Sequence, residues 1–450
     1  MHFDKAIRSQ LPYNEVMEFT TLCYREAAMS EKRTYDFQRQ IETYDRADIV
    51  VIGGGPAGTA AAISAARRGK KVILLEKSGQ LGGMGTLGNV SIFMPIGNVT
   101  GIYREMIAEV LAEYLPEHHD TSIAPQYSPF ELRYYLNEKM KKEGVEVIYH
   151  TEFVGTVKDG ARLEAVIAST REGLKAFEAK QFIDCTGDGR VALDAGVPHT
   201  SGRIEDGLTQ PMTLMFMMQN TGKPVTPILP ESCYYYEKVS DLPQGRHLFW
   251  ERNKDGQLLV NMTRVKGNGA KIKDINYAET EALRQVFSIV HYLQRNGFET
   301  YALSHVANQV GVRETNQIQG LYTLTEQDVV EGRRFQDVVA QTNYEIDIHS
   351  PDGKKTTDER KVSGYDIPYR CMVPEEVENL LVAGRSISAT HVAMSSMRVQ
   401  PTCYALGQAA GIAATIALDD ACVIRDVSID ALHEGLREMN VVFHKLASYS

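Results

Sequence analysis

The stretch that decides the fold is Asp48-Ile49-Val50-Val51-Ile52-Gly53-Gly54-Gly55-Pro56-Ala57-Gly58. The residues up to Ile52 suit a buried parallel strand, and the glycines at 53, 55 and 58 follow in the order G-x-G-x-x-G. The first such glycine allows a tight turn, the second admits a phosphate to the backbone, and the third lets a helix pack on the strand. The N–H groups that begin this helix attract negative charge. The stretch therefore predicts a cradle for a dinucleotide pyrophosphate, with a turn that serves packing alone as the alternative.

A second strand and a glycine-rich loop follow the first helix. Residues 71–76 are mostly apolar and end in Glu76, about 20 residues after the glycines, where a carboxylate accepts hydrogen bonds from ribose hydroxyls. Residues 78–89 then contain five glycines in twelve residues, which indicates backbone wrapped around a ligand; a flexible connector is the alternative. A dinucleotide whose second half lies along this loop fits FAD better than NAD.

Further strands and helices are predicted from alternation and turn residues. The expected elements of the first half are two helices, a third parallel strand and the three strands of a β-meander: residues 102–115, 129–143, 145–149, 152–158, 163–169 and 176–185. Those expected later are a methionine-rich buried strand, two more strands, a long helix, a returning strand and a small-residue helix: residues 212–218, 247–250, 258–262, 277–296, 379–384 and 401–411. The predicted fold class is α/β, a doubly wound parallel sheet with a β-meander plus an inserted α+β domain.

Changes in the pattern of apolar, charged and small residues along the chain also predict its domains. They are an N-terminal arm with surface helices between residues 14 and 39, the first part of the nucleotide-binding domain, an inserted substrate or cap domain, a returning segment, and a C-terminal helix and tail: residues 1–46, 47–194, 195–367, 368–425 and 426–450. Within the insertion Arg313 stands beside Glu314, which indicates either a surface ion pair or a substrate-facing arginine.

Composition limits the class of protein. The formal net charge of −10 argues against nucleic acid as the main partner. The absence of an 18-residue apolar run predicts no membrane span, and charges near the N-terminus predict a cytoplasmic protein. The six cysteines are scattered, with no C-x-x-C pair and no metal-ligand spacing, so neither a dithiol relay nor a metal site is expected. A homodimer is possible.

Taken together the motifs resemble a known family. They are VIGGGPAG at 51–58, LGGMGT at 81–86, FIDCTGDG at 182–189, VAGRSISATH at 382–391 and RVQPT at 398–402. In this order they are similar to bacterial FAD-dependent oxidoreductases with the glutathione-reductase-like Rossmann fold, and more distantly to fumarate reductase flavoproteins. The resemblance covers residues 47–420.

The resemblance implies that these segments hold FAD without a covalent bond. The residues implied as cofactor contacts are Gly53, Gly55, Pro56, Ala57, Gly58, Glu76, Lys77, Gly82, Gly83, Met84, Thr86, Phe153, Val154, Thr186, Gly187, Gly384, Arg385, Gln400 and Thr402. Phe153 or Val154 would lie by the adenine, and the helix that starts near Gln400 would stabilise negative charge on reduced flavin. A second glycine fingerprint for NAD(P)H is missing, so we expect the organic substrate or a transient donor to reduce the flavin.

Three functions are consistent with this pattern. The leading one is an oxidoreductase in which a small organic substrate exchanges a hydride with flavin N5. His391 would transfer the proton, although a structural histidine is an equal alternative, and Arg313 and Arg398 would anchor a substrate carboxylate. The alternatives are a monooxygenase or halogenase-like enzyme that activates oxygen, and a tRNA-modifying flavoprotein, which the acidic balance disfavours.

Overall fold

The structure is a computed structural model that describes residues 34–92, 94, 99–114, 127–252, 256–351 and 357–443. The chain divides into two compact units, Met1–Ile41 and Glu42–Ser450. The surface helices expected between residues 14 and 39 lie largely outside the described residues, and residues 34–41 form no helix or strand. The elements below all belong to the second unit.

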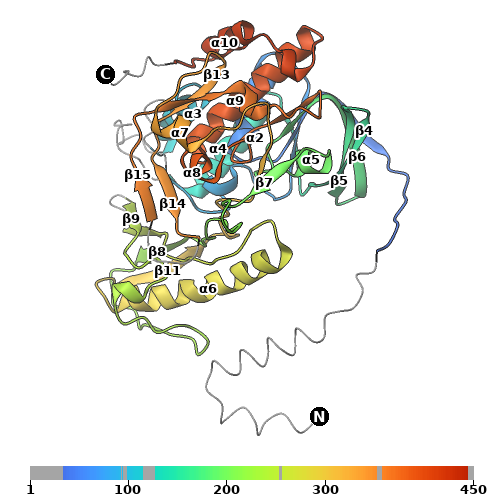
Figure 1. Cartoon of the computed structure of the whole chain (residues 1–450). Coiled ribbons are helices and arrows are strands. Elements are labelled where there is room, and N and C mark those ends of the chain that lie inside the picture. Colours follow the sequence, from blue (N-terminus) through green and yellow to red (C-terminus); the bar gives the residue numbers. More distant parts are fainter. Residues whose placement is uncertain are drawn as a thin grey trace. The chain divides into compact units, whose positions relative to one another are not determined.

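A seven-stranded sheet organises the second unit (Figure 1). Its strands run in the order β3-β2-β1-β6-β5-β4, and β17 pairs with the end of β6. Their bounds are β1 Thr43–Ile52, β2 Val72–Glu76, β3 Glu146–Tyr149, β4 Glu152–Asp159, β5 Arg162–Thr170, β6 Gly173–Asp184 and β17 Leu380–Val382. The pairs of β3, β2, β1, β6 and β17 are parallel, whereas β4, β5 and the start of β6 form an antiparallel meander. The predicted fold class is therefore confirmed.

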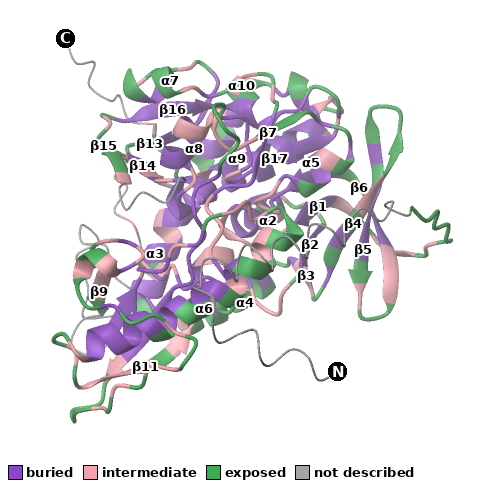
Figure 2. Cartoon of the chain, turned by 60° about the horizontal axis from the view of Figure 1, so that its bottom comes forward, coloured by how far each residue is buried: buried purple, intermediate pink, exposed green. Residues whose placement is uncertain are grey.

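Both faces of β2 and of the second half of β1 are buried, which explains their continuous apolar sequences, whereas the edge strand β3 is half-buried (Figure 2). Ile49 and Val51 of β1 belong to one hydrophobic cluster together with helices α2 and α9. Val50 and Ile52 belong to another cluster, which includes residues of α5. The helices are α2 Pro56–Arg67, α5 Arg190–Asp194 and α9 Gln400–Asp419. The motif strand thus lies at the centre of the unit.

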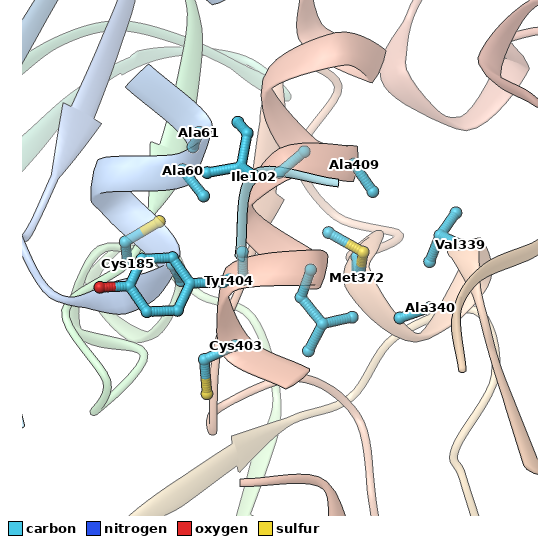
Figure 3. Close-up of a cluster of buried hydrophobic side chains, with 14 of the residues drawn as sticks. Ala60, Ala61, Ile102, Cys185, Val339, Ala340, Met372, Cys403, Tyr404 and Ala409 are labelled. Carbon is cyan, nitrogen blue, oxygen red and sulfur yellow. The ribbon is translucent and has the colours of Figure 1, made fainter. Parts of the chain in front are cut away.

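Helices α2 and α9 touch backbone to backbone. A Cβ atom on Gly407 would lie 1.9 Å from the carbonyl oxygen of Ala57, and one on Gly411 would lie 2.3 Å from that of Ala61. Figure 3 shows the alanines of α2 beside Tyr404 and Ala409 of α9. Because only small residues allow this approach, the returning segment is fixed against the glycine motif over three hundred residues earlier in the chain.

A second, antiparallel sheet has its own hydrophobic core. Its order is β11-β8-β10-β9, and helix α6 packs in the same cluster. The bounds are β8 Phe216–Asn220, β9 Phe249–Arg252, β10 Gln257–Val260, β11 Tyr301–Val306 and α6 Ile272–Gln294. The strand expected at 212–218 begins only at Phe216, because Met212 and Thr213 make isolated bridges to other segments. Helix α6 begins five residues before the expected start: Ile272 of its first turn is 80% exposed, and the buried stripe of the helix starts only at Ala278.

The remaining elements surround these two cores. They are α3 Ile102–Tyr114, α4 Pro129–Lys142, β7 His199–Ser201, β12 Asn316–Ile318, α7 Glu326–Val330, β13 Val338–Thr342, β14 Ile346–His349, β15 Thr357–Arg360, β16 Tyr365–Pro368, α8 His391–Met397, α10 Ile429–Glu438, and the 3-10 turns η1 Gly83–Gly85, η2 Val239–Asp241, η4 Tyr369–Met372 and η5 Ile424–Asp426. Side chains of β13, β14 and β16 join the first core, although they fall within the predicted insertion. The predicted domain limits stay predictions. No helix among the described residues is long and apolar enough to cross a membrane.

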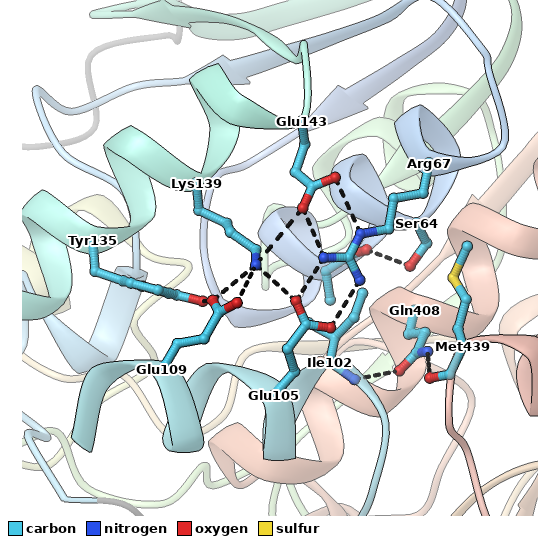
Figure 4. A network of polar contacts seen from close by, with 11 residues as sticks. Ser64, Arg67, Ile102, Glu105, Glu109, Tyr135, Lys139, Glu143, Gln408 and Met439 are labelled. Carbon is cyan, nitrogen blue, oxygen red and sulfur yellow. Dashed lines mark hydrogen bonds and ion pairs between the residues drawn. The ribbon is translucent and has the colours of Figure 1, made fainter. Parts of the chain in front are cut away.

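An ion-pair network fastens three helices on one side of the parallel sheet (Figure 4). Lys139 of α4 contacts Glu105 and Glu109 of α3 at 2.7 and 2.8 Å, and its side chain is only 6% exposed. Arg67 of α2 contacts Glu105 at 2.6 Å and Glu143 at 2.7 Å. The network therefore crosslinks the helix that follows the glycine motif to its two neighbours.

Candidate functional site

The carboxyl ends of the parallel strands open into one cavity of about 950 Å³. Its lining includes Ile52 at the end of β1, Glu76 at the end of β2, Cys185 after β6 and Ala383 after β17. The same cavity continues to residues of the second sheet and of β14, among them Trp250 and Asp347. Because parallel strands end on one edge, segments distant in sequence meet in this cavity.

The three motif glycines meet different surroundings. A Cβ atom on Gly53, whose φ is +102°, would lie 2.4 Å from the carbonyl oxygen of Cys185, and one on Gly58 would lie 1.7 Å from that of Gly53. A Cβ atom on Gly55 would have only the Cα of Gly83 within 4 Å, at 3.9 Å. The first and third glycines are thus required by the chain itself, whereas the second keeps the cavity open beside the start of α2.

The start of α2 suits an anion. Gly55 is its N-cap residue and offers no side-chain acceptor, and the first turn contains no acidic residue. Unpaired N–H groups and the positive end of the helix dipole therefore remain available to a phosphate.

Glu76, at the end of β2, lines the cavity beside the glycine turn. Its Oε2 atom accepts a hydrogen bond from the N–H of Gly54 at 2.8 Å, and Oε1 accepts one from the N–H of Ser78 at 2.7 Å. Each carboxylate oxygen has a further lone pair, so the fixed carboxylate can still accept from ribose hydroxyls.

Helix α9 presents a second free N-terminus to the same cavity. Its N-cap residue, Val399, provides no side-chain cap, and Gln400 and Cys403 of its first turn line the cavity. Gln400 is held by a hydrogen bond from its Nε2 to the carbonyl of Val90 at 2.7 Å. The Oγ1 atom of Thr402 is buried and has no partner among the described residues. The free helix start fits a polar or anionic part of a ligand, whereas Thr402 is not among the lining residues.

Arg385 connects the cradle to the segment around Val312. Its Nη2 donates to Asp188 Oδ1 at 2.6 Å, its Nε donates to the carbonyl of Gly187 at 2.5 Å, and its Nη1 donates to the carbonyl of Val312. Burial acts to raise the pKa of Asp188, but the Arg385 guanidinium holds that pKa below its usual value. The guanidinium thus connects the segment of Arg385 to the turn at Gly187 and Asp188 and to the segment of Val312.

Most residues predicted as cofactor contacts line the cavity: Gly53, Gly55, Pro56, Ala57, Glu76, Lys77, Gly83, Met84, Phe153, Thr186, Gly187, Gly384, Arg385 and Gln400. Five do not: Gly58, Gly82, Thr86, Val154 and Thr402. Alternation along β4 separates the two adenine candidates, because Phe153 is buried at the cavity whereas Val154 is 48% exposed. Thr86 donates its hydroxyl to the carbonyl of Leu81 at 2.6 Å and so holds the glycine loop.

The far part of the cavity is rich in cationic side chains. Arg313 and Arg398, both predicted from the sequence, line it together with His349, Tyr344 and Asp347. Arg398 Nη2 lies 3.2 Å from Asp347 Oδ2. Burial, followed by the nearby Arg398, lowers the pKa of Arg313 to about 9. Burial, followed by the surrounding arginines, also lowers the pKa of His349, so that its imidazole is neutral.

His391, the predicted proton-transfer residue, is not among the lining residues. Its Nδ1 atom lies 2.7 Å from Oε1 of Glu314, a fully buried carboxylate whose Oε2 also accepts from the N–H of Gln210 at 2.9 Å. Arg313 and Glu314 are adjacent, yet only Arg313 lines the cavity, while Glu314 pairs with His391.

Several residues of the site carry no sequence motif. Tyr344, Asp347 and His349 stand in or beside β14, and Arg264 follows β10. Only the tertiary fold brings them to Arg313 and Arg398, so no spacing along the chain could have found them. Among the described residues, no group of three His, Cys, Asp or Glu side chains could hold a metal ion.

A nucleotide-binding parallel sheet, a glycine cradle and a continuous cavity define the class of a dinucleotide-dependent enzyme. The sequence profile of the family described as "FAD dependent oxidoreductase" matches residues 48–436. The chain belongs to this family, and its cofactor is FAD.

Comparisons with individual proteins are short or distant. A segment of 35 residues is 66% identical to the NADH oxidase of Thermoanaerobacter brockii, covering 8% of this chain and 5% of that protein. A segment of 183 residues is 25% identical to the thiamine thiazole synthase of Pyrococcus horikoshii, covering 37% of this chain and 67% of that protein. A geranylgeranyl bacteriochlorophyll reductase-like structure from Thermoplasma acidophilum superposes with a TM-score of 0.43 at 13% identity, covering 90% of this chain and 85% of that chain. The chain thus spans about 5% of the first of these curated relatives.

Proposed function

We propose that this chain oxidises or reduces a small organic substrate that lies between the FAD cradle and the inserted segment. The observation that supports this function is the continuity of the cavity. Its lining runs without interruption from the glycines at the end of β1 to Arg313 and Arg398. A cradle alone would suit a binding protein, whereas a second chamber with charged side chains provides a place for a reactant.

The residues of the cradle fit FAD. The start of α2, with Gly55, would hold the pyrophosphate, Glu76 the adenosine ribose, and Phe153 the adenine. The start of α9, with Gln400, would lie at the flavin end. When bound, FAD supplies the two-electron chemistry, a hydride exchanged with the substrate at flavin N5.

The remaining site residues orient the substrate and exclude water. Arg313 and Arg398 would hold an acidic group, because a guanidinium binds a carboxylate through two N–H groups. Arg385 keeps the insertion and the cradle at a fixed separation through its three hydrogen bonds. The role of His391 in proton transfer stays a prediction, and its bond to Glu314 supports a positioning role for the Arg313 segment.

Anaerobic absorbance spectroscopy of the FAD-loaded protein tests this function. We expect small organic donors or acceptors to change the flavin redox state, and NAD(P)H alone to leave it unchanged. Bleaching by NAD(P)H with no response to any organic compound would overturn the proposal. Oxygen consumption coupled to a hydroxylated or halogenated product would instead establish the monooxygenase or halogenase alternative.

The other predictions concern partners and relatives. A gel shift with bulk tRNA tests the tRNA-modifying alternative, for which we expect no binding. A homodimer, a cytoplasmic location and a distant similarity to fumarate reductase flavoproteins stay predictions.

A further inference from the structure

Three arginines gather at the far part of the cavity: Arg313 and Arg398 line it, and Arg264 lies behind the lining residues Thr213 and Asn261. Arg313 and Arg264 donate from their Nη1 atoms to the same hydroxyl, Thr213 Oγ1, at 2.6 and 3.0 Å. Arg398 is close enough to lower the pKa of Arg313, after the larger effect of burial. Among the described residues, Asp347 is the carboxylate within ion-pair distance of this arginine cluster, at 3.2 Å from Arg398. Arg246, Lys361, Glu345 and Glu359 line the cavity as well and contribute two charges of each sign, with Arg246 and Glu359 paired at 2.6 Å. The three arginines of the cluster and Asp347 therefore leave an excess of two positive charges.

The other acceptors of the cluster are neutral. Arg313 Nη1 also donates to the carbonyl of Pro211 at 2.6 Å, and Arg264 Nη1 donates to the carbonyl of Thr263 at 2.6 Å and to Asn261 Oδ1 at 3.0 Å. A neutral acceptor satisfies an N–H group but leaves the positive charge uncompensated.

Several N–H groups of the cluster have no acceptor at all within the described chain. The Nε and Nη2 atoms of Arg264 and the Nε atom of Arg398 are buried and unpartnered. Toward the residues that the structure describes, Arg313, which lines the cavity, donates only from Nη1, so the edge formed by its Nε and Nη2 is available to a ligand. That edge is one that binds a carboxylate or phosphate through two parallel hydrogen bonds.

The cluster is costly without a ligand. Like charges in a low-dielectric site repel, and burial penalises each of them. The lowered pKa values of Arg313 and His349 have these two causes. An anion that enters the cavity reduces the repulsion and supplies an acceptor to the guanidinium of Arg313, which lines the cavity. The excess of two positive charges sets the charge of the ligand that neutralises it.

We propose that the arginine cluster of Arg264, Arg313 and Arg398 selects a small organic dianion as the substrate of this enzyme. The inference rests on the proposed function, because it names the substrate class of the same cavity. Arg313 and Arg398 line the cavity and contact the ligand. Arg264 does not line it and acts on the ligand through its charge from behind Thr213 and Asn261.

Isothermal titration calorimetry of the FAD-loaded protein tests the proposal without turnover. The probes are malonate, succinate and glutarate, the monomethyl ester of each, and inorganic phosphate. We expect at least one dianion to bind and its monoanionic ester to bind more weakly. A dicarboxylate or phosphate that binds better identifies which group carries the charge. Equal binding of acid and ester, or no binding by any probe at millimolar concentration, would overturn the proposal.

Variants of Arg264 separate charge from structure. Arg264→Gln weakens binding of a dianion on the order of 10-fold and of a monoanion about 3-fold, because the Coulomb energy scales with ligand charge. Arg264→Lys restores most of the affinity, and Arg162→Gln, on the exposed meander, changes nothing. A flavin spectrum like that of the wild type confirms that each variant is folded. An equal loss for both ligand charges, or no rescue by lysine, would contradict the electrostatic role.

The outcomes distinguish the charge selection by the arginine cluster from the proposed redox reaction. A dianion that binds, in a protein whose flavin redox state no organic compound changes, supports the charge selection and refutes the proposed reaction. A neutral compound that bleaches the flavin, in a protein that binds no dianion, supports the reaction and refutes the charge selection.

Discussion

The substitution Gly55→Ala separates the role of the cradle in binding from its role in folding. Gly55 has φ −75° and ψ −169°, which alanine adopts without strain, and the added methyl group would contact only the Cα of Gly83, at 3.9 Å. Alanine is a poorer N-cap residue by about 0.5–1 kcal/mol, but it reduces the entropy of the unfolded chain by about 0.4–1 kcal/mol. The stability of the cofactor-free protein should therefore change by less than about 1 kcal/mol.

FAD binding should respond very differently to Gly55→Ala. The methyl group occupies the space where a phosphate approaches the N–H groups at the start of α2, so about two charge-assisted hydrogen bonds are lost, worth about 1.5–3 kcal/mol each. The dissociation constant for FAD should rise by at least about 100-fold. Fluorescence titration of the cofactor-free protein with FAD measures the affinity, and urea denaturation of the same sample measures the stability.

Two further glycines provide matched controls for this substitution. Gly155→Ala, on β4 with Asp194 Oδ2 at 3.7 Å as its nearest contact, should change neither quantity. Gly58→Ala would place a Cβ atom 1.7 Å from the carbonyl oxygen of Gly53 and should impair both. Normal FAD affinity in Gly55→Ala, or destabilisation as large as in Gly58→Ala, would refute the assignment.

Three other predictions follow from single contacts. Phe153→Ala should weaken FAD binding about 10-fold through lost apolar burial. Val154→Ala, on the exposed side of the same strand, should leave FAD binding unchanged. Equal effects of the two substitutions in the FAD titration would contradict the placement of Phe153 at the cofactor. Lys139→Met should lower the free energy of unfolding by about 1 kcal/mol in urea, because Glu105 stays paired with Arg67 and Glu109 is 40% exposed to solvent. An unchanged midpoint would count against the network. Hydrogen bonds from Arg67, opposed by burial and joined by Lys139, lower the pKa of Glu105 to about 2. The ionised carboxylate of Glu105 therefore stabilises the fold fully above its unfolded pKa of about 4.3, and this stabilisation is lost as the pH falls toward 2. Glu105→Gln should flatten the same part of a plot of the thermal midpoint against pH.

The glycine cradle could be predicted because its determinants are local. The order of Gly53, Gly55 and Gly58 after an apolar strand, and the acidic end of the next strand, reflect backbone geometry that a few consecutive residues decide. The returning strand β17 was also predictable, since an apolar strand followed by a small-residue helix is a pattern of the same kind.

The substrate chamber could be predicted only in part. Arg313 was notable because it stands beside the oppositely charged Glu314, which left a surface ion pair and a substrate-facing arginine as equal alternatives. In the structure Arg313 and Glu314 do not pair with each other, because neighbouring side chains point to opposite sides of the chain. Arg313 lines the cavity, and Glu314 binds His391. Arg264 and Asp347 meet Arg313 only through tertiary contacts, which no local pattern encodes.

The most direct test of the single-cavity account is the visible difference spectrum of the FAD-loaded protein upon addition of the tightest-binding dianion. We expect the ligand to perturb the flavin absorbance bands in the wild type, and we expect Arg313→Gln to abolish the perturbation while the flavin stays bound. Calorimetric binding of the dianion without any change in the flavin spectrum, or the same perturbation in Arg313→Gln, would contradict it.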